Sequence, residues 1–309
     1  MEGRDRRTLE APASDRPVRT HRAPPPAAEF DSTPTAAEPR SIALDHSAVA
    51  SANLSHARPF LTAPFLTAPF LTAQWRNLAV LNFVINADVL APYIPRGTEL
   101  DLWHGQALVS LVGFEFRDTR VWGWPIPFHR NFAEVNLRFY VRRREADGWR
   151  RGVTFVRELA PRRAVAWVAR HFYGENYLTV PMRHRADSPN GDPLASYWWP
   201  WQGCECRLEL VAGGEGRTAQ PGTLEEFIIE HYWGYAGGRG RKTIEYRVDH
   251  PRWKLWPARE ARFTADAASL YGPLFAAALS APPVSAFYVD GSPVTVYRGQ
   301  AIAIPLEKP

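Results

Sequence analysis

Cysteine is almost absent from this chain of 309 residues. Cys204 and Cys206 are the whole supply, two positions apart in a stretch with strand character. Their Cα atoms would lie roughly 6.5–7 Å apart with both side chains on one side of the strand, so the thiols cannot form an unstrained disulfide. A disulfide-stapled secreted fold is therefore excluded. No second Cys cluster offers the further ligands that a metal site needs. We therefore expect the two cysteines to act as small apolar residues on one face of a strand.

Lysine is nearly as scarce. Only Lys242, Lys254 and Lys308 occur, so 34 of the 37 basic residues are arginine. A Schiff base needs an uncharged lysine in a protected site, so any such chemistry must use one of these three. Lys308 stands near the end of the chain and Lys242 beside a glycine-rich turn, and both are expected in water. Lys254 has Trp253 and Trp256 around it, which cation–π packing explains.

Long apolar runs are missing as well. No stretch approaches the roughly 20 residues that cross a bilayer. The N-terminus has no apolar run of a secretory signal, and acids among its arginines speak against a transit peptide. We therefore expect a cytoplasmic protein without a membrane partner.

The positive charge is modest. The net charge is +5, and residues 1–58 hold eight arginines and eight acids, so the excess belongs to the rest of the chain. The longest basic run is Arg142-Arg143-Arg144. Nucleic-acid binding calls for a basic stripe with interleaved aromatics or a known motif. Neither occurs, and no nucleic-acid partner is expected.

Composition divides the chain into three parts. Residues 1–58 are rich in Pro, Ala, Arg, Ser and Thr and show no periodicity, which predicts a disordered tail. Residues 59–73 repeat Pro-Phe-Leu-Thr-Ala three times, a period too short for a solenoid, and are expected to lead into the first strand. Residues 74–309 are predicted to form a single domain.

Strands dominate this domain. We expect strands at residues 75–86, 99–103, 107–116, 132–143, 149–158, 177–185, 204–211 and 241–250, and a final hairpin over 287–296 that turns at Asp290-Gly291. His104-Gly105 and Asp147-Gly148 predict two further tight hairpins. Short turns between strands favour a largely antiparallel sheet, and the fold class is α+β.

A few helices are expected on this sheet. They cover a short segment from Asp88, residues 161–172, a helix opened by the capping box Thr223-Leu-Glu-Glu226, and residues 267–279 with an interruption at Gly272-Pro273.

The sequence contains none of the familiar catalytic motifs that its composition might suggest. The run Gly237-Gly-Arg-Gly240 has Arg241 where a phosphate-binding loop needs glycine before Lys-Thr, and it leads from helix to strand. No nucleophile elbow and no His-Glu-x-x-His motif occur. No cofactor and no metal are expected.

The segment from His129 to Val141 carries the most chemical information. Alternation along the expected strand places Ala133, Val135, Leu137, Phe139 and Val141 on one apolar face. The other face holds Phe132, Glu134, Asn136, Arg138 and Tyr140. A half-buried strand with this face in water is one interpretation. In a closed sheet the same face would line a polar cavity, where a carboxylate, an amide and a guanidinium orient a small acid or exchange a proton.

His231 stands on the apolar stripe of its expected helix, which favours a core histidine over a catalytic one.

Several stretches together resemble the YqjF-like family of uncharacterised bacterial proteins. The similarity lies in Trp75-Arg-Asn-Leu, in Pro125-Ile-Pro-Phe-His-Arg-Asn-Phe-Ala-Glu-Val-Asn136, in the helix from Thr223 to Tyr232 and in Val248-Asp-His-Pro-Arg-Trp-Lys-Leu-Trp-Pro257. It covers residues 70 to 301. Lys254 replaces a proline that the family usually has in the last stretch.

That family is in turn similar to the acetoacetate decarboxylase-like superfamily. The resemblance implies a mostly antiparallel sheet curled into a cone-shaped barrel around a buried cavity. The superfamily's Gly-x-Pro-Lys-Lys strand corresponds to residues 169–177 here, where both lysines are missing. Its cavity arginine and glutamate correspond to Arg76 and Glu134. The resemblance thus implies a cavity and argues against the decarboxylase chemistry.

Three hypotheses remain open from the sequence. In the first, the chain is a small-molecule enzyme or binder without a Schiff base, in which Glu134 acts as general base or anchor and Arg76 binds an anionic group. The remaining expected ligand contacts are His129, Asn131, Asn136 and Tyr177. The second is a non-catalytic ligand-binding sensor, and the third a structural or interaction protein with a packed interior. The expected partner is a small molecule, and no pattern indicates an oligomeric state.

Overall fold

The structure is a computed structural model that describes residues 69–125, 127–161, 177–188, 191–237 and 242–302. The expected tail and the helix expected over 161–172 lie almost wholly outside these residues. Within them, no helix is both long and apolar enough to cross a membrane.

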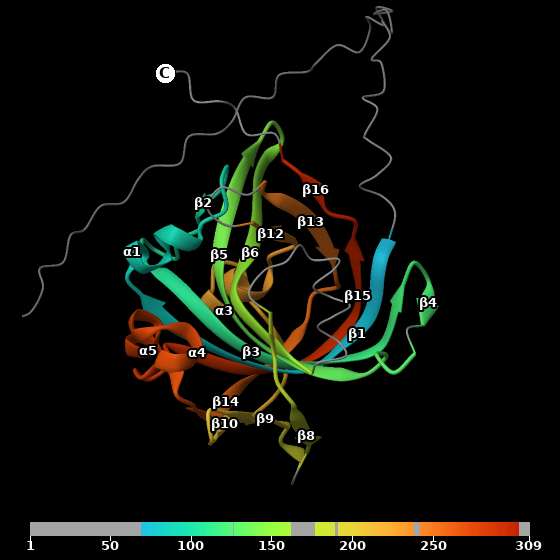
Figure 1. The fold of residues 1–309 in the computed structure, drawn as a ribbon, viewed down its shortest axis with the longest axis vertical. Helices are drawn as coiled ribbons and strands as arrows, with labels where there is room; N and C mark the ends of the chain where they lie inside the picture. Colours follow the sequence, from blue (N-terminus) through green and yellow to red (C-terminus); the bar gives the residue numbers. More distant parts are fainter. Residues whose placement is uncertain (1–68, 126, 162–176, 189–190, 238–241, 303–309) are drawn as a thin grey trace, which may run out of the picture. The chain divides into compact units, whose positions relative to one another are not determined.

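The centre of the fold is a curled sheet that closes on itself (Figure 1). Successive neighbours are β13, β12, β6, β5, β3, β1 and β15, and β15 pairs with β13 again to complete the ring. Their bounds are β1 Pro69–Ile85, β3 Ala107–Val121, β5 Phe132–Glu145, β6 Gly148–Ala160, β12 Trp233–Ala236, β13 Ile244–Asp249 and β15 Ser285–Tyr297. Only the β12–β6 contact in this ring is parallel, so the sheet is mostly antiparallel.

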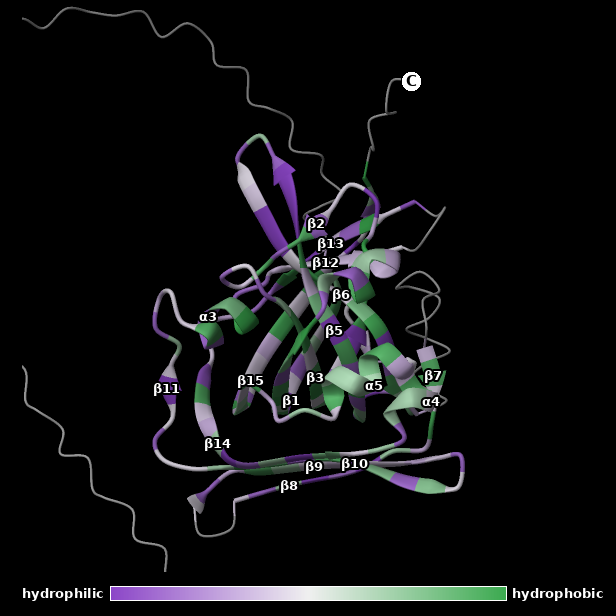
Figure 2. Cartoon of the chain, turned by 90° about the vertical axis from the view of Figure 1, so that its left-hand side faces the viewer, coloured by the Kyte–Doolittle hydropathy of each residue, from purple (hydrophilic) through white to green (hydrophobic). Residues whose placement is uncertain are grey.

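A second layer extends this sheet through β14, Lys254–Thr264, which pairs with β15. Strands β10, β9 and β8 follow in that order and run across one end of the ring (Figure 2). They span Cys204–Ala212, Leu194–Trp201 and Arg183–Asp187. Short strands attach at the edges: β2 Glu99–Leu100, β4 Trp124–Pro125, β7 Tyr177–Thr179, β11 Arg217–Thr218 and β16 Gln300–Ala301.

The helices are short. Helix α1, Ala87–Leu90, continues into the 3-10 turn η2, Ala91–Tyr93. Helices α4, Ala267–Tyr271, and α5, Pro273–Leu279, lie against the outer face of the curled sheet (Figure 1). Helix α3, Leu224–Ile229, packs its buried residues on the inner side. The result is a strand-rich fold with few helices.

Strand β5 separates two apolar clusters, because both of its faces are buried. Its predicted apolar face, from Ala133 to Val141, packs into the outer cluster with α4 and α5. The opposite face joins the inner cluster with α3. Glu134 on that face is only 3% exposed. The interpretation that this face lies in water is therefore wrong, and the closed-sheet alternative is correct.

Several local predictions are confirmed. Strands β5 and β6 form the hairpin at Asp147-Gly148. Thr223 caps α3 by accepting a hydrogen bond from the backbone of Glu226, as the capping box requires. Gly272 separates α4 from α5. Of the two cysteines expected as apolar residues of one strand face, Cys206 is buried and Cys204 is exposed.

The final hairpin predicted at Asp290-Gly291 is wrong, because β15 runs straight through these residues. Gly291 has φ +89, and a Cβ there would lie 2.0 Å from the backbone oxygen of Trp75. The glycine therefore serves a close approach of two paired strands and not a turn.

Other boundaries differ for identifiable reasons. Strand β1 begins at Pro69, so the third five-residue repeat is part of it. Strand β2 pairs with β5, and its expected hairpin with β3 is reduced to the Trp103–Gln106 bridge. The strand expected at residues 177–185 divides into β7 and β8 around Pro181, whose missing N–H interrupts a ladder. No strand was predicted at β9 or β14, nor at the short strands β4, β11, β12 and β16.

Candidate functional site

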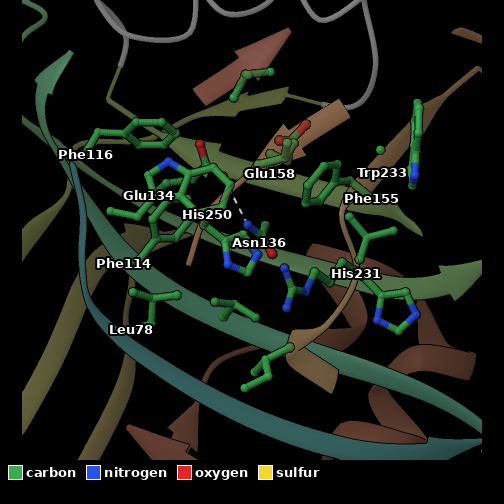
Figure 3. A pocket seen from close by; sticks show the side chains of 18 of the residues that line it. Leu78, Phe114, Phe116, Glu134, Asn136, Phe155, Glu158, His231, Trp233 and His250 are labelled. Carbon is green, nitrogen blue, oxygen red and sulfur yellow. Dashed lines mark hydrogen bonds between the residues drawn. The ribbon is translucent and has the colours of Figure 1, made fainter. Parts of the chain in front are cut away.

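The inside of the ring contains a cavity of about 80 Å³, which is large enough for several water molecules or a compact ligand. Its wall is mostly apolar and aromatic, with residues from β1, β3, β5, β6, β13 and α3. The polar and charged residues among these are few: Glu134, Asn136, Arg138, Glu158, Tyr177, His231, Tyr246 and His250. Figure 3 shows Glu134, Asn136 and His250 close together in this space, with Glu158 and His231 on either side of them.

Strand β5 supplies three of the polar residues through its two-residue alternation. Glu134, Asn136 and Arg138 occupy successive inward positions. The Nδ2 of Asn136 donates a hydrogen bond to Oε1 of Glu134 across 3.1 Å (Figure 3). Burial raises the pKa of Glu134 from 4.5 to about 7, against the smaller lowering effect of this hydrogen bond. The carboxyl group can therefore gain or lose a proton near neutral pH.

Glu158 of β6 is one of the polar cavity residues that the sequence did not predict for the site, with Tyr246 and His250. Asn136 pairs with Glu158 across the hairpin. Val156 is an extra residue in β6, because Leu137 pairs with Arg157 while Arg138 pairs with Phe155. Simple alternation from Phe155 would have turned Glu158 outward, and this β-bulge turns it inward instead. The bulge has no clear signature in the sequence, so only the pairing register could have identified the residue.

Tyr177 begins β7 and pairs with Glu158 in parallel register. Its hydroxyl donates a hydrogen bond to Oε1 of Glu158 across 2.7 Å. Burial and the nearby Glu158 and Glu134 carboxyl groups raise the pKa of Tyr177 well above its ordinary value. The phenol is therefore a hydrogen-bond donor at physiological pH, bound to Glu158 and close enough to Glu134 to interact with its charge.

Arg138 projects a cation into the cavity without a carboxylate to balance it. Within the part of the chain that the structure describes, no Asp or Glu lies within ion-pair distance of Arg138. Its guanidinium carbon lies 6.0 Å from the centre of the Tyr140 ring. Its buried Nε also has no hydrogen-bond partner in these residues. A cation in such surroundings is costly unless an anion accompanies it.

Three further buried polar atoms on the cavity wall lack a partner in the described residues. They are the indole Nε1 of Trp75, Oδ1 of Asn136 and Nδ1 of His231. Buried polar groups in folded proteins almost always have partners, so each one calls for an explanation. Together with Nε of Arg138, residues of the wall hold two unused donors and two atoms able to accept a hydrogen bond, all of them buried. Buried polar groups of this kind suit a site that receives a polar ligand or ordered water.

The other residues predicted for the site lie elsewhere. Arg76 does not line the cavity. It pairs with Asp290 at 3.1 Å and donates to Oε1 of Gln74 at 2.9 Å, at a half-exposed position. His129 and Asn131 line a separate surface hollow with Phe128 and other residues. Thus the structure gathers Glu134, Asn136 and Tyr177 around one cavity and leaves Arg76, His129 and Asn131 outside it.

Neither described lysine reaches the cavity. Lys242 and Lys254 are both exposed, so the aromatic neighbours expected to enclose Lys254 do not bury it. Lys308 lies outside the described residues. In the same described ranges, no cluster of three or more His, Cys, Asp or Glu has the arrangement of a metal site.

Comparison with known proteins gives consistent results. The family model DUF2071, described as an uncharacterized conserved protein, matches residues 72–293. The uncharacterized protein YqjF of Bacillus subtilis is 29% identical over 184 residues, which are 59% of this chain and 73% of that protein.

Among solved structures, acetoacetate decarboxylase from Legionella pneumophila has a TM-score of 0.53 at 13% identity, covering 84% of this chain and all of that one. The enduracididine biosynthesis enzyme MppR, complexed with pyruvate, has a TM-score of 0.54 at 14% identity, covering 80% and 95%. At such identities these likenesses show the fold.

Proposed function

The chain belongs to the DUF2071 family and has an acetoacetate decarboxylase-like fold, and from this premise we propose that it is an enzyme for a small organic acid. The acid binds in the cavity inside the ring, where Arg138 holds its carboxylate and Glu134 exchanges a proton with it. The observation that carries the proposal is that Arg138, which has no carboxylate partner among the described residues, lines the same cavity as a carboxyl group whose pKa is about 7.

Arg138 supports an anionic ligand. A guanidinium presents donors in a planar fork that matches a carboxylate, and charge-assisted hydrogen bonds of this kind are among the stronger ones. A bound carboxylate would supply the missing partner for Nε. The small volume of the cavity favours a compact acid. MppR, whose fold is similar, was solved with pyruvate, an acid of this size class.

Glu134 supports acid–base chemistry. A general acid or base works best with a pKa near the operating pH, and burial brings Glu134 there. Its hydrogen bond with Asn136 fixes the direction of the carboxyl group. The neighbouring Glu158 has Tyr177 as a donor, so the two carboxyl groups have different surroundings. Different surroundings let one carboxyl group stay ionised while the other is protonated.

The proposal contains no imine. A Schiff-base lysine must be uncharged and close to the substrate, and Lys242 and Lys254 are exposed on the surface. Acetoacetate decarboxylase is therefore a guide to the fold and not to the reaction of this chain.

The test compares Arg138→Met with Arg76→Met. Binding of pyruvate, acetoacetate, lactate and 3-hydroxybutyrate is measured by calorimetry or ligand-detected NMR. We expect at least one acid to bind the native protein, and Arg138→Met to weaken it roughly 10- to 150-fold, because hydrogen bonds to charged groups contribute about 1.5–3 kcal/mol. Arg76→Met removes an arginine that is already paired with Asp290 outside the cavity, so it should leave affinity unchanged.

Two outcomes would contradict the proposal. If no acid binds, or if Arg138→Met binds as well as the native protein, the cavity is not an organic-acid site. If an acid binds but the native protein never converts it or exchanges its protons with solvent, the enzyme part fails and a ligand-binding sensor remains. For a converted acid, Glu134→Gln should abolish turnover while keeping most of the affinity.

A further inference from the structure

His231 lies in the cavity wall, and its neighbours hold both ring nitrogens in fixed directions. The residue follows α3, which ends at Ile229, instead of belonging to its apolar stripe. It is buried as predicted, with a side chain only 1% exposed. Its ring contacts Tyr140 and Phe227, with centroid separations of 4.8 and 5.3 Å. These neighbours fix the plane of the ring, so its two nitrogens point in defined directions.

Asp101 determines which ring nitrogen carries the proton. Its Oδ2 lies 3.3 Å from Nε2 of His231 and accepts a hydrogen bond from Nε of Arg151 at 2.6 Å. Burial alone would raise the pKa of Asp101, but the hydrogen bonds from His231 and Arg151 lower it, so the group is a carboxylate. A carboxylate only accepts hydrogen bonds, so Nε2 holds the proton and Nδ1 carries a lone pair.

That lone pair has no donor in the described residues. Nδ1 of His231 is buried and unpartnered, although the residue lines the cavity. Burial lowers the pKa of His231 to about 4, so the ring is neutral at physiological pH and Nδ1 stays an acceptor. A ligand that approaches this atom must therefore offer an O–H or N–H group.

We propose that Nδ1 of His231 accepts a hydrogen bond from a hydroxyl group of the bound acid, so that the cavity selects hydroxy acids over the same acids without the hydroxyl. This inference rests on the proposed function and adds the second recognition point. Among the described residues, the side chains of Arg138 and Trp75 hold buried donors without a partner for the carboxylate, and those of His231 and Asn136 hold buried acceptors without a partner for the hydroxyl. A molecule that has a carboxylate alone leaves the acceptors unpaired.

The test uses matched acids: lactate against propionate, and 3-hydroxybutyrate against butyrate. We expect the hydroxy acid of at least one pair to bind the native protein about tenfold more tightly or better, because the other acid leaves a buried acceptor without a donor. His231→Gln should reduce this ratio to about one. The glutamine amide nitrogen can still donate to Asp101, but nothing replaces Nδ1. Affinity for the simple acid should stay the same.

His184→Gln is the matched control. His184 also lies beside a buried carboxylate, with Nε2 3.4 Å from Oε2 of Glu115, but it lines the surface hollow and not this cavity. The substitution should leave the ratio unchanged. Equal binding of hydroxy and simple acids by the native protein overturns this inference and leaves the proposed function in place. Binding of none of the four acids overturns both.

A measurement on the native protein keeps the inference testable even if His231→Gln does not fold. Labelling histidine with nitrogen-15 distinguishes a protonated from an unprotonated ring nitrogen. We expect His231 to be protonated at Nε2 alone, and lactate to shift the Nδ1 resonance more than propionate does. A proton on Nδ1 in the free protein, or equal shifts with both acids at saturation, would overturn the inference.

Discussion

Replacing Glu134 by glutamine should change how the stability of the protein depends on pH. Glutamine keeps the size of the side chain and can still accept the 3.1 Å hydrogen bond from Asn136. It removes only the ability to ionise. Because Glu134 is 3% exposed, the ionised carboxylate is the form that burial penalises, and the neutral amide does not pay this cost. Tyr177 and Tyr246 lie near enough to interact with its charge, and the Arg138 cation lines the same cavity, but burial outweighs these neighbours in setting the pKa of Glu134.

The size of the effect follows from the pKa. Burial raises it from 4.5 to about 7, and at about 1.4 kcal/mol for each tenfold change in proton affinity this is about 3 kcal/mol. The folded protein holds a proton that the unfolded chain releases between these pH values, so stability falls as pH rises through this window. Glu134→Gln escapes the loss. The free energy of unfolding of Glu134→Gln should therefore exceed that of the native protein by an amount that grows from near zero at pH 4.5 to about 3 kcal/mol above pH 7.

Thermal unfolding followed by circular dichroism at pH 5 and pH 8 measures this difference. About 3 kcal/mol corresponds to roughly 6–12 °C in Tm for a protein of this size. Glu115→Gln is the matched control with the opposite sign. Burial alone would raise its pKa, but hydrogen bonds from His184, Arg117 and Asn77 lower it to about 2. Its stabilising effect is present above pH 4.5 and lost as pH falls toward 2, so this variant should be less stable than the native protein by about the same amount at pH 5 and at pH 8.

The result that would refute the reasoning is a Tm difference between Glu134→Gln and the native protein that is the same at both pH values. Glu134 would then titrate alike in the folded and unfolded states, and the cavity would be as polar as water around it.

Three further predictions concern the rest of the chain. Gly291→Ala should cost several kcal/mol in chemical denaturation, because its Cβ would lie 2.0 Å from the backbone oxygen of Trp75 and φ is +89; native-like stability would disprove the close approach. Borohydride added with acetoacetate should trap no adduct by mass spectrometry, since Lys254 is exposed; an adduct on this lysine would contradict the absence of an imine. A chain that begins at Pro59 should keep the Tm of the full chain within about 2 °C, because the composition of residues 1–58 offers little apolar area to bury; a larger fall would show that the tail docks.

Alternation along β5 is what made part of the site predictable. A strand has a period of two whatever its surroundings, so the sequence alone places Glu134, Asn136 and Arg138 on one face. Whether that face meets water or a cavity depends on the closure of the ring. The closing pair is β13 with β15, two strands that are not neighbours in the sequence. The resemblance to a cone-shaped barrel supplied this closure; the periodicity did not.

The anion-binding residue shows the limit of the resemblance. Arg76 was carried over as the cavity arginine, but strand alternation corrects this: Trp75 lines the cavity, so the adjacent Arg76 faces the other side of β1. The irregularity that follows at Asn77, with φ +57, then returns Leu78 to the cavity side. Arg138 needed no such correction, because β5 alternates without interruption from Glu134 onward to this residue. The residue on the regular strand was therefore the better candidate.

The extra residue in β6 has a consequence for insertions and deletions. In a regular strand, loss of one residue exchanges the two faces of everything beyond it. Near Val156 the opposite holds: the strand already contains two residues opposite Leu137, so removal of Val156 would restore plain alternation and leave Glu158 pointing into the cavity. Removal of Thr154 instead would require the pairing to shift on one side of the gap. Homologues can thus differ in length at this one point and still present the same carboxyl group, and an alignment that penalises the gap would misplace it.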